Sequence, residues 1–276
     1  MVTLLCTVRG CRRPLAGAKG RMVCPRRHAF DVGRNGYVSL LQPQDRRSPR
    51  AGDTREVRAA RRRCVARGLA APLLDTILSL AALTPAGVAL PGDAVLDVGC
   101  GEGDVLSAVA SRLGCEGHGV DIAAAAIDAA ARRYPRCRWV VANADRLLPY
   151  ARASFRLVMS VTARLNPTEF RRVVRDDGAV LIVVPGADDL VEVREAVLGS
   201  RVLRDRVERT VAMFEPRFAL AEHRRVRQLA RLDPSALVDA MTGAYRALRP
   251  RERTRLAALG AMDVTIAHDV LCLRPV

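Results

Sequence analysis

The sequence predicts an α/β fold, a parallel sheet with helices on both faces, preceded by a small N-terminal module. From Ala94 onward, short apolar segments typical of strands alternate with segments of helical spacing. Such alternation requires crossover connections between parallel strands. The first of these strands ends in a glycine-rich turn, and residues 1–41 combine three cysteines and a histidine with few residues that could form a core.

Composition narrows the class of protein. The chain has 276 residues, and 50% of them are hydrophobic, which suffices for one large domain and a small module. No apolar run approaches the roughly 20 residues that a membrane span needs, and the N-terminus lacks the apolar segment of a secretory signal. We therefore expect a cytoplasmic protein without membrane segments. The net charge of +16 favours a polyanionic partner such as RNA or DNA, although a solvated basic surface would also explain it.

Residues 1–41 contain a candidate zinc site. Cys6-x4-Cys11 and Cys24-x3-His28 are two close pairs separated by twelve residues, a spacing typical of two short knuckles around one tetrahedral zinc ion. A segment with so little core needs the metal to fold. Because a disulfide framework is unexpected in a reducing compartment, we expect Cys6, Cys11, Cys24 and His28 to bind zinc.

Basic residues in and after this module are candidates for RNA contact. Arg26 and Arg27 lie near Phe30 and Tyr37, and arginines with aromatics between them suit phosphate contact and base stacking. The two rings could equally form the small core of the module.

Residues 42–83 are predicted to be basic linker helices. Asp53 or Thr54 is the expected N-cap, Pro72 is expected to divide the segment into two helices, and Arg61, Arg62 and Arg63 form a basic face for RNA phosphates.

The remaining residues, 84–276, are predicted to form the α/β domain. The expected strands cover 94–100, 116–121, 138–142, 155–161 and 179–184. The expected helices cover 105–113, 123–134, 167–175, 190–198, 202–213, 234–241 and 249–259. Residues 263–273 close the domain as one strand or a hairpin.

The glycine turn predicts a nucleotide-like cofactor. The first strand ends Asp97-x-Gly99-x-Gly101-x-Gly103, and Asp121 ends the next strand 22 residues beyond Gly99. A carboxylate at about this spacing accepts hydrogen bonds from ribose hydroxyls. Position 104 is Asp where a pyrophosphate-binding turn would have Gly, and the carboxylates of Glu102 and Asp104 suit a cation such as the sulfonium of S-adenosylmethionine. The turn therefore predicts a Rossmann-like, S-adenosylmethionine-dependent methyltransferase domain, with dinucleotide binding as the weaker interpretation.

Two later segments complete the predicted pocket. Asn143 and Asp145 follow the third strand, where a side-chain acceptor could hold adenine or where a plain polar turn could lie. Ser160 opens the segment 160–167 at the end of the fourth strand, the edge where open parallel sheets bind ligands. The substrate base is expected to meet the methyl donor there.

These motifs together resemble those of the RlmA-type 23S rRNA guanine-N1 methyltransferases, a family that includes members giving macrolide resistance. The resemblance covers nearly the whole chain. Besides the zinc ligands, it depends on Cys24-Pro25-x-x-His28-x-Phe30-Asp31-x4-Gly36-Tyr37-Val38, Gly52-Asp53, Ala60-Arg61-Arg62, Asp97-x-Gly99-x-Gly101 and Pro185-Gly186.

The resemblance implies S-adenosylmethionine as cofactor, with Gly101 and Glu102 in its site, a zinc module that helps to grip an rRNA hairpin, and a homodimer. Three segments depart from the family pattern. Leu69 and Ala70 follow Gly68 where the family usually has His-Tyr, Asp188 and Asp189 occupy the region of a family histidine near the cofactor, and the late aromatic stretch is Met241-Thr242-Gly243-Ala244-Tyr245. Asp189 is retained as a candidate cofactor contact.

The leading hypothesis is methyl transfer from S-adenosylmethionine to N1 of a guanine in 23S rRNA. Guanine N1 carries a proton on the Watson–Crick edge, so the base must be unpaired or extruded. Asp53 is the candidate proton acceptor, although a helix cap would also explain it. Two alternatives are a methyltransferase acting on a small molecule and an rRNA-binding protein that has lost catalysis.

Overall fold

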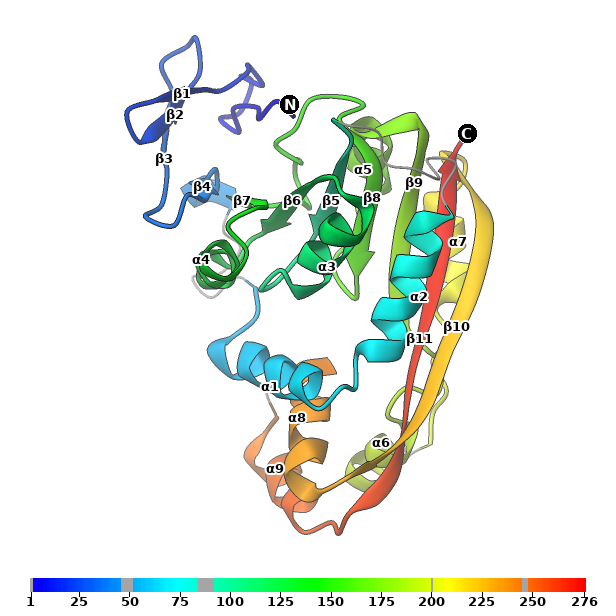
Figure 1. Cartoon of the computed structure of the whole chain (residues 1–276). Coiled ribbons are helices and arrows are strands. Elements are labelled where there is room, and N and C mark those ends of the chain that lie inside the picture. The colour runs from blue at the N-terminus through cyan, green and yellow to red at the C-terminus, as the bar shows by residue number, and fades with distance from the viewer. Residues whose placement is uncertain (1, 46–51, 84–91, 200, 245–247) are drawn as a thin grey trace.

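The computed structural model describes residues 2–45, 52–83, 92–199, 201–244 and 248–276. Its centre is an eight-stranded sheet with the strand order β10-β11-β9-β8-β5-β6-β7-β4 (Figure 1). The strands of this sheet are β4 (Val38–Ser39), β5 (Ala94–Val98), β6 (Glu116–Asp121), β7 (Arg138–Val141), β8 (Phe155–Val161), β9 (Val174–Pro185), β10 (Phe218–Leu232) and β11 (Met262–Pro275).

The sheet is mixed rather than purely parallel, which corrects the prediction. Strands β4 to β9 pair in parallel, as expected for crossover connections. Strand β11 runs antiparallel to both β9 and β10. The chain therefore completes one edge of the parallel sheet with a long antiparallel pair, a common feature of doubly wound sheets.

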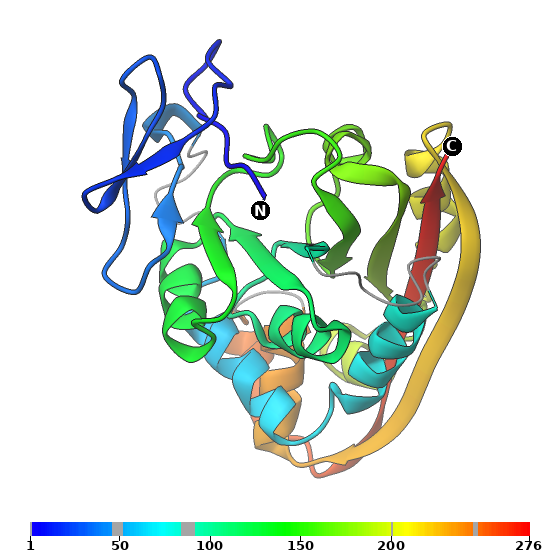
Figure 2. The same ribbon diagram turned by 45° about the horizontal axis from the view of Figure 1, so that its top comes forward.

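Both faces of the sheet are covered by helices. Because side chains alternate along a strand, Leu96 of β5 packs in one core cluster with Phe170 and Phe214. Its neighbour Val95 packs in another cluster with Leu106. The first face is covered by α5 (Pro167–Val173) and α7 (Val207–Phe214), and the second by α2 (Ala71–Ala82), α3 (Asp104–Leu113) and α4 (Ala124–Arg133). Figure 2 shows α2 on the inner side of the long, curved β10.

A third cluster lies at the far end of β10 and β11. It is formed by α6 (Val191–Leu198), α8 (Pro234–Ala244) and α9 (Pro250–Ala257). Helix α1 (Arg55–Ala66) packs on α8 and so connects this end of the molecule to the sheet (Figure 1).

The N-terminal module lies at the other edge of the sheet. Strands β1 (Ala16–Ala18), β2 (Arg21–Val23) and β3 (Ala29–Asp31) form a small antiparallel sheet. Strand β4 follows and pairs with β7, and a short 3-10 helix, η1 (Pro43–Asp45), comes next. Residues on the N-terminal side of the predicted boundary at residue 41 thus belong to the central sheet. The boundary at residue 84 lies outside the described residues.

Several predicted elements differ in detail from the structure. Helix α1 ends at Ala66 and α2 begins at Ala71, so Pro72 lies in the first turn of α2, where proline is tolerated. Helix α7 begins at Val207 rather than 202, and β9 begins at Val174 rather than 179. None of the described helices could span a bilayer alone; α1 and α2 together have the length and composition, but they are bent by 83° at their junction.

Candidate cofactor cleft and zinc site

A cleft of about 580 Å³ opens at the carboxyl edge of the parallel strands. Strands β5 and β8 are neighbours here although β6 and β7 intervene in the sequence, so the cleft lies at a switch point, where open α/β sheets bind ligands. It is lined by Gly52, Asp53, Arg61, Val98, Gly99, Val120, Asp121, Ile122, Ala142, Asn143, Ala144, Asp145, Val161, Thr162, Ala163 and Arg164.

The glycine turn between β5 and α3 needs its glycines for two reasons. Gly99 and Gly103 have φ values of +77° and +85°, which other residues rarely adopt. A Cβ at Gly99 would also collide with Ala163, and one at Gly103 would collide with the ring of Trp139. The backbone can therefore lie close to β8 on one side and to β7 on the other. Of these glycines, Gly99 lines the cleft directly.

Two predicted carboxylates, Asp97 and Asp121, lie beside this turn. Asp121 ends β6 and accepts hydrogen bonds from the backbone N–H groups of Gly101 (3.0 Å) and Ala123 (2.8 Å). Its burial raises its pKa, although these bonds oppose the shift. Burial, and next the charge of Asp121, raises the pKa of Asp97 to about 7. Asp121 lines the cleft, whereas Asp97 lies beneath it in β5 with Oδ1 buried and without a hydrogen-bond partner among the described residues.

Asn143 and Asp145, the residues considered either for adenine or for a plain polar turn, both line the cleft. The side chain of Asn143 is already engaged: its Oδ1 accepts from the backbone N–H of Asp145, and its Nδ2 donates to the carbonyl of Asp45. Asn143 therefore shapes this wall. Ser160 is fully buried inside β8 and donates to the carbonyl of Arg164 at 3.5 Å, so it supports the loop at the cleft.

The carboxylates of Glu102 and Asp104 have partners outside the cleft. One nitrogen of Arg62 donates to both Glu102 oxygens at 2.7 and 2.8 Å, and Arg58 and Arg133 lie within 3.6 Å. Asp104 accepts from Arg133 and from the hydroxyl of Tyr134, each through Oδ1. Neither Glu102 nor Asp104 is among the residues that line the cleft. The carboxylates that line the cleft are Asp53, Asp121 and Asp145.

The predicted RNA-binding arginines of α1 also have internal partners. Arg61 pairs with Asp53 and donates to the carbonyl of Gly243, and Arg63 binds both oxygens of Asp239 at 2.6 and 2.8 Å. Arg61, Arg62 and Arg63 remain 44%, 49% and 54% exposed. These contacts hold α1 against the glycine turn and α8. Sequence reasoning missed this arrangement because the carboxylates lie 8 to 176 residues away.

The structure separates the two functions considered for Asp53. Thr54 is the N-cap of α1, with its hydroxyl accepting from the backbone N–H of Val57. Asp53 instead lines the cleft, where its charge acts on Asp121.

Asp189 is not among the residues that line the cleft. It is 4% exposed and accepts from the backbone N–H of Ala267 at 3.0 Å, and burial raises its pKa to about 6. Its neighbour Asp188 pairs with Arg225 and Arg227 of β10. The described positions that depart from the family pattern, including Leu69 and Ala70, are likewise absent from the lining of the cleft; Tyr245 lies outside the described residues.

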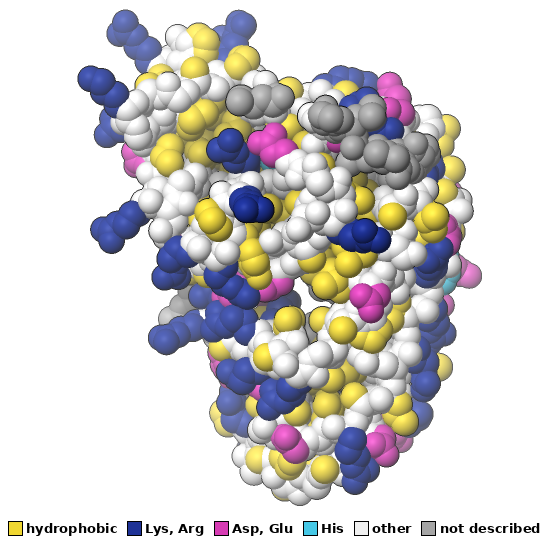
Figure 3. Space-filling model, viewed as in Figure 1, with side chains coloured by type: hydrophobic (Ala, Val, Ile, Leu, Met, Phe, Trp, Pro, Cys, Tyr) yellow, Lys and Arg dark blue, Asp and Glu magenta, His cyan; other side chains and the backbone are white. Residues whose placement is uncertain are grey.

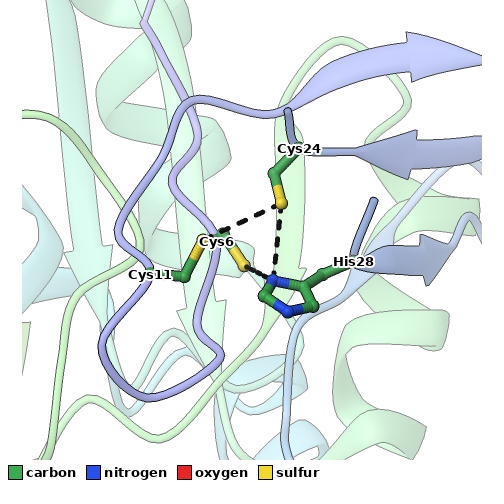
Figure 4. Close-up of side chains that lie close together, drawn as sticks. All are labelled: Cys6, Cys11, Cys24 and His28. Carbon is green, nitrogen blue, oxygen red and sulfur yellow. Dashed lines mark hydrogen bonds between the residues drawn. The ribbon is translucent and has the colours of Figure 1, made fainter. Parts of the chain in front are cut away.

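Cys6, Cys11, Cys24 and His28 form a compact cluster in the N-terminal module (Figure 4). Their ligand atoms all lie within 4.8 Å of one another. The Sγ atoms of Cys11 and Cys24 are 3.8 Å apart, and Nδ1 of His28 is 3.4 Å from Cys6 Sγ and 3.5 Å from Cys24 Sγ. Tetrahedral zinc with ordinary bond lengths places sulfurs about 3.8 Å apart and sulfur and nitrogen about 3.6 Å apart. The cluster therefore fits one zinc ion.

Two family models match the segments that contain the glycine turn and the zinc cluster. The family described as "Methyltransferase domain" matches residues 95–181, and the zinc-ribbon family described as "RlmA, N-terminal" matches residues 5–49. A crystal structure of a Bacillus halodurans protein shares the fold with a TM-score of 0.52 at 17% identity, covering 72% of this chain and 100% of that one.

Known relatives match almost the whole length of the chain. The Streptomyces fradiae protein named 23S rRNA (guanine(748)-N(1))-methyltransferase is 35% identical, covering 96% of this chain and 95% of its own. A Micromonospora griseorubida protein is 34% identical and covers 96% of both chains. Since the zinc cluster and the glycine turn lie within these matched regions, the chain belongs to the RlmA-type family of 23S rRNA guanine-N1 methyltransferases.

Proposed function

We propose that this protein transfers a methyl group from S-adenosylmethionine to N1 of a guanine in 23S rRNA. The observation that carries the proposal is the cleft at the switch point between β5 and β8, where the glycine turn and Asp121 occur together. The 35% identity over 96% of the chain to a 23S rRNA guanine-N1 methyltransferase supports this substrate.

The cleft residues divide into a cofactor side and a substrate side. S-adenosylmethionine supplies an electrophilic methyl group when it is bound. Asp121 offers acceptor oxygens for ribose hydroxyls, and the wall from Asn143 to Asp145 is available to adenine. Thr162 and Arg164, which line the cleft just after β8, are left for the extruded guanine and its phosphate; Arg164 lies 4.0 Å from Asp145.

Asp53 is the proposed acceptor of the N1 proton. It lines the cleft, and its side chain is 37% exposed beside the guanidinium of Arg61. The Asp53→Asn variant should lower kcat by about 10²-fold or more, as expected for loss of a general base, with little change in cofactor affinity. Glu56→Gln is the matched control because Glu56 is not part of the cleft lining and pairs with Arg253. Equal kcat values for the two variants would refute this role.

We propose that the N-terminal module contacts the RNA backbone through Arg26 and Arg27, which are both exposed. Dark blue side chains gather over this module and, lower on the same side, over α4 and α1 (Figure 3). Arg61, Arg62 and Arg63 are each paired with a carboxylate but remain 44%, 49% and 54% exposed, and we propose that their remaining guanidinium N–H groups also contact phosphates.

The reaction can be tested directly. Incubation of the protein with 23S rRNA and S-adenosylmethionine carrying a labelled methyl group should place the label on one guanine, seen as a stop in primer extension. Absence of both label and stop, with a protein that is folded and loaded with zinc, would refute the proposed reaction.

The alternative of a catalytically diverged rRNA-binding protein was suggested by the residues that depart from the family pattern. Those described in the structure do not line the cleft, so they give little reason to expect lost cofactor binding. Titration calorimetry with S-adenosylmethionine distinguishes this alternative, which predicts RNA binding without cofactor binding. A small-molecule methyltransferase would instead methylate its substrate without the N-terminal module.

We also propose that the protein is a homodimer, as the family resemblance implies, and that it acts in the cytoplasm. We further propose that its methylation protects ribosomes from macrolides, as in the family members that give macrolide resistance. Light scattering of the purified protein tests the dimer. Expression in a macrolide-sensitive strain should raise the inhibitory macrolide concentration, and the Asp53→Asn variant should not.

A further inference from the structure

We propose that the zinc module has a second role: through its contacts with Arg146 and Asp45, it positions the wall of the cleft that receives adenine. Arg146 and Asp45 are then positioning residues, because neither lines the cleft. The inference rests on the proposed function, since it takes S-adenosylmethionine as the ligand of the cleft.

The wall is a turn directly after β7. The backbone carbonyl of Asn143 accepts from the N–H groups of Arg146 and Leu147, both at 3.2 Å. The Asn143 side chain accepts from the N–H of Asp145 at 3.0 Å. Asn143 therefore holds one side of the wall, while Nδ2 of Asn166 donates to the carbonyls of Ala144 and Asp145, each at 3.1 Å, and holds the other.

Two segments of the N-terminal region hold this turn from outside. Nδ2 of Asn143 donates to the carbonyl of Asp45 at 2.9 Å. Arg146 donates through Nη2 to the carbonyl of Thr7 at 2.7 Å, and its Nε lies 2.9 Å from a carboxylate oxygen of Asp45. The side chain of Asp45 is 3% exposed, and Thr7 is 2% exposed. The side chain of Arg146 is 28% exposed, so the network is partly buried, and removing Arg146 takes a partner from the buried carboxylate of Asp45 and from the carbonyl of Thr7, which is costly.

Zinc enters this network through Cys6. Thr7 follows Cys6 directly in the chain, and the hydroxyl of Thr7 donates to the carbonyl of Leu40 at 2.6 Å. A zinc ion held by Cys6, Cys11, Cys24 and His28 thus fixes the backbone that receives Arg146. Because so small a module depends on its metal to fold, loss of zinc should release Thr7 and loosen the wall.

A second contact between the module and the sheet domain provides a matched control. Nδ2 of Asn35 donates to Asp128 of α4 at 2.8 Å. This bond also holds the module in place. Among the described residues, however, neither Asn35 nor Asp128 is hydrogen-bonded to the turn at Asn143. Asn35→Ala should therefore leave the affinity for the cofactor unchanged.

The experiment measures the Kd of S-adenosylmethionine by calorimetry on the full chain. Zinc-loaded wild type is compared with wild type stripped by a chelator, and with Arg146→Ala and Asn35→Ala. Stripping and Arg146→Ala should each raise Kd by about tenfold, a typical coupling between sites. Stripping the Arg146→Ala variant should add little further. Asp45→Asn, which retains its backbone carbonyl, should give a smaller loss and serves as the second variant if Arg146→Ala is unstable.

The outcomes separate the two proposals. Absence of binding by zinc-loaded wild type would refute the proposed function and this inference with it. Binding that is unaffected by both zinc removal and Arg146→Ala would refute only the positioning role. Equal losses in Asn35→Ala and Arg146→Ala would also refute it, because they would show that any loosening of the module has the same effect.

Discussion

At the residue scale, Asp97 and Asp121 illustrate how position on neighbouring strands divides the roles of two acids. Asp121 has two backbone donors and access to the cleft. Asp97 is buried beneath it, and burial, with the charge of Asp121, raises its pKa from 3.8 to about 7. A carboxyl group in this environment favours its neutral form.

This shift predicts a pH-dependent stability. Between about pH 4 and pH 7 the folded protein holds a proton on Asp97 that the unfolded chain has lost, so this residue's contribution to stability falls as pH rises through that window and is constant above it. Asp97→Asn cannot ionise, so its stability relative to wild type should increase by about 3 kcal/mol from pH 4 to pH 7.5. Urea unfolding of both proteins at several pH values measures the difference; a difference independent of pH would contradict the prediction.

Thr162 is strained at the mouth of the cleft. Its φ of +50° lies in the left-handed region, where a branched side chain is unfavourable. Glycine adopts this conformation freely, so Thr162→Gly should be more stable than Thr162→Ala by about 1 kcal/mol, even after the extra entropy of the unfolded glycine chain. Urea unfolding of the two variants tests this. An alanine variant as stable as the glycine variant would show that the strain is absent.

At the scale of elements, α1 is attached by both apolar and charged groups. Val57 and Ala60 are buried, and Arg62 pairs with Glu102 and Arg63 with Asp239. From the sequence alone, the same arginines form a basic face suited to phosphates. The carboxylates that they meet come from α8 and the glycine turn, so the folded arrangement assigns them a structural role in addition.

Removal of one such attachment should be measurable. Asp239 is 6% exposed and Arg63 is 54% exposed, so Arg63→Ala should reduce the free energy of unfolding by about 1–2 kcal/mol, between the values for surface and buried pairs. Arg171→Ala, which breaks a pair with the exposed Asp176, should have an effect below about 0.5 kcal/mol. Equal stabilities for the two variants, compared by thermal unfolding, would argue against an anchoring role for α1 arginines.

Within the α/β domain, the sequence prediction missed strand β10. Its residues alternate between exposed and half-buried positions, and four of them are arginines within 224–231. Such a polar segment has no clear apolar face. It is a strand because it pairs with β11 along nearly its whole length and because α2 covers one of its faces, and both partners are distant in the sequence.

At the scale of the whole molecule, the net charge of +16 predicts salt-dependent RNA binding. If Arg26 and Arg27 contact phosphates, the double variant Arg26→Ala/Arg27→Ala should reduce the slope of log K against log salt by about 2. Filter binding to 23S rRNA fragments across a salt series measures this slope. The control Arg171→Ala should keep the wild-type slope, because Asp176 already neutralises its charge. An unchanged slope in the double variant would place the RNA contacts elsewhere.

The sequence by itself determined the zinc ligands, the glycine turn with Asp121, and most strands and helices of the parallel sheet. These features depend on short spacings and local periodicity, so they can be recognised within one segment of the chain. Only the tertiary structure decided that β11 is antiparallel, that β4 of the N-terminal module extends the central sheet, and which acids the α1 arginines bind. Each of these depends on contacts between distant segments, where burial and charge pairing, rather than local preference, decide the partner.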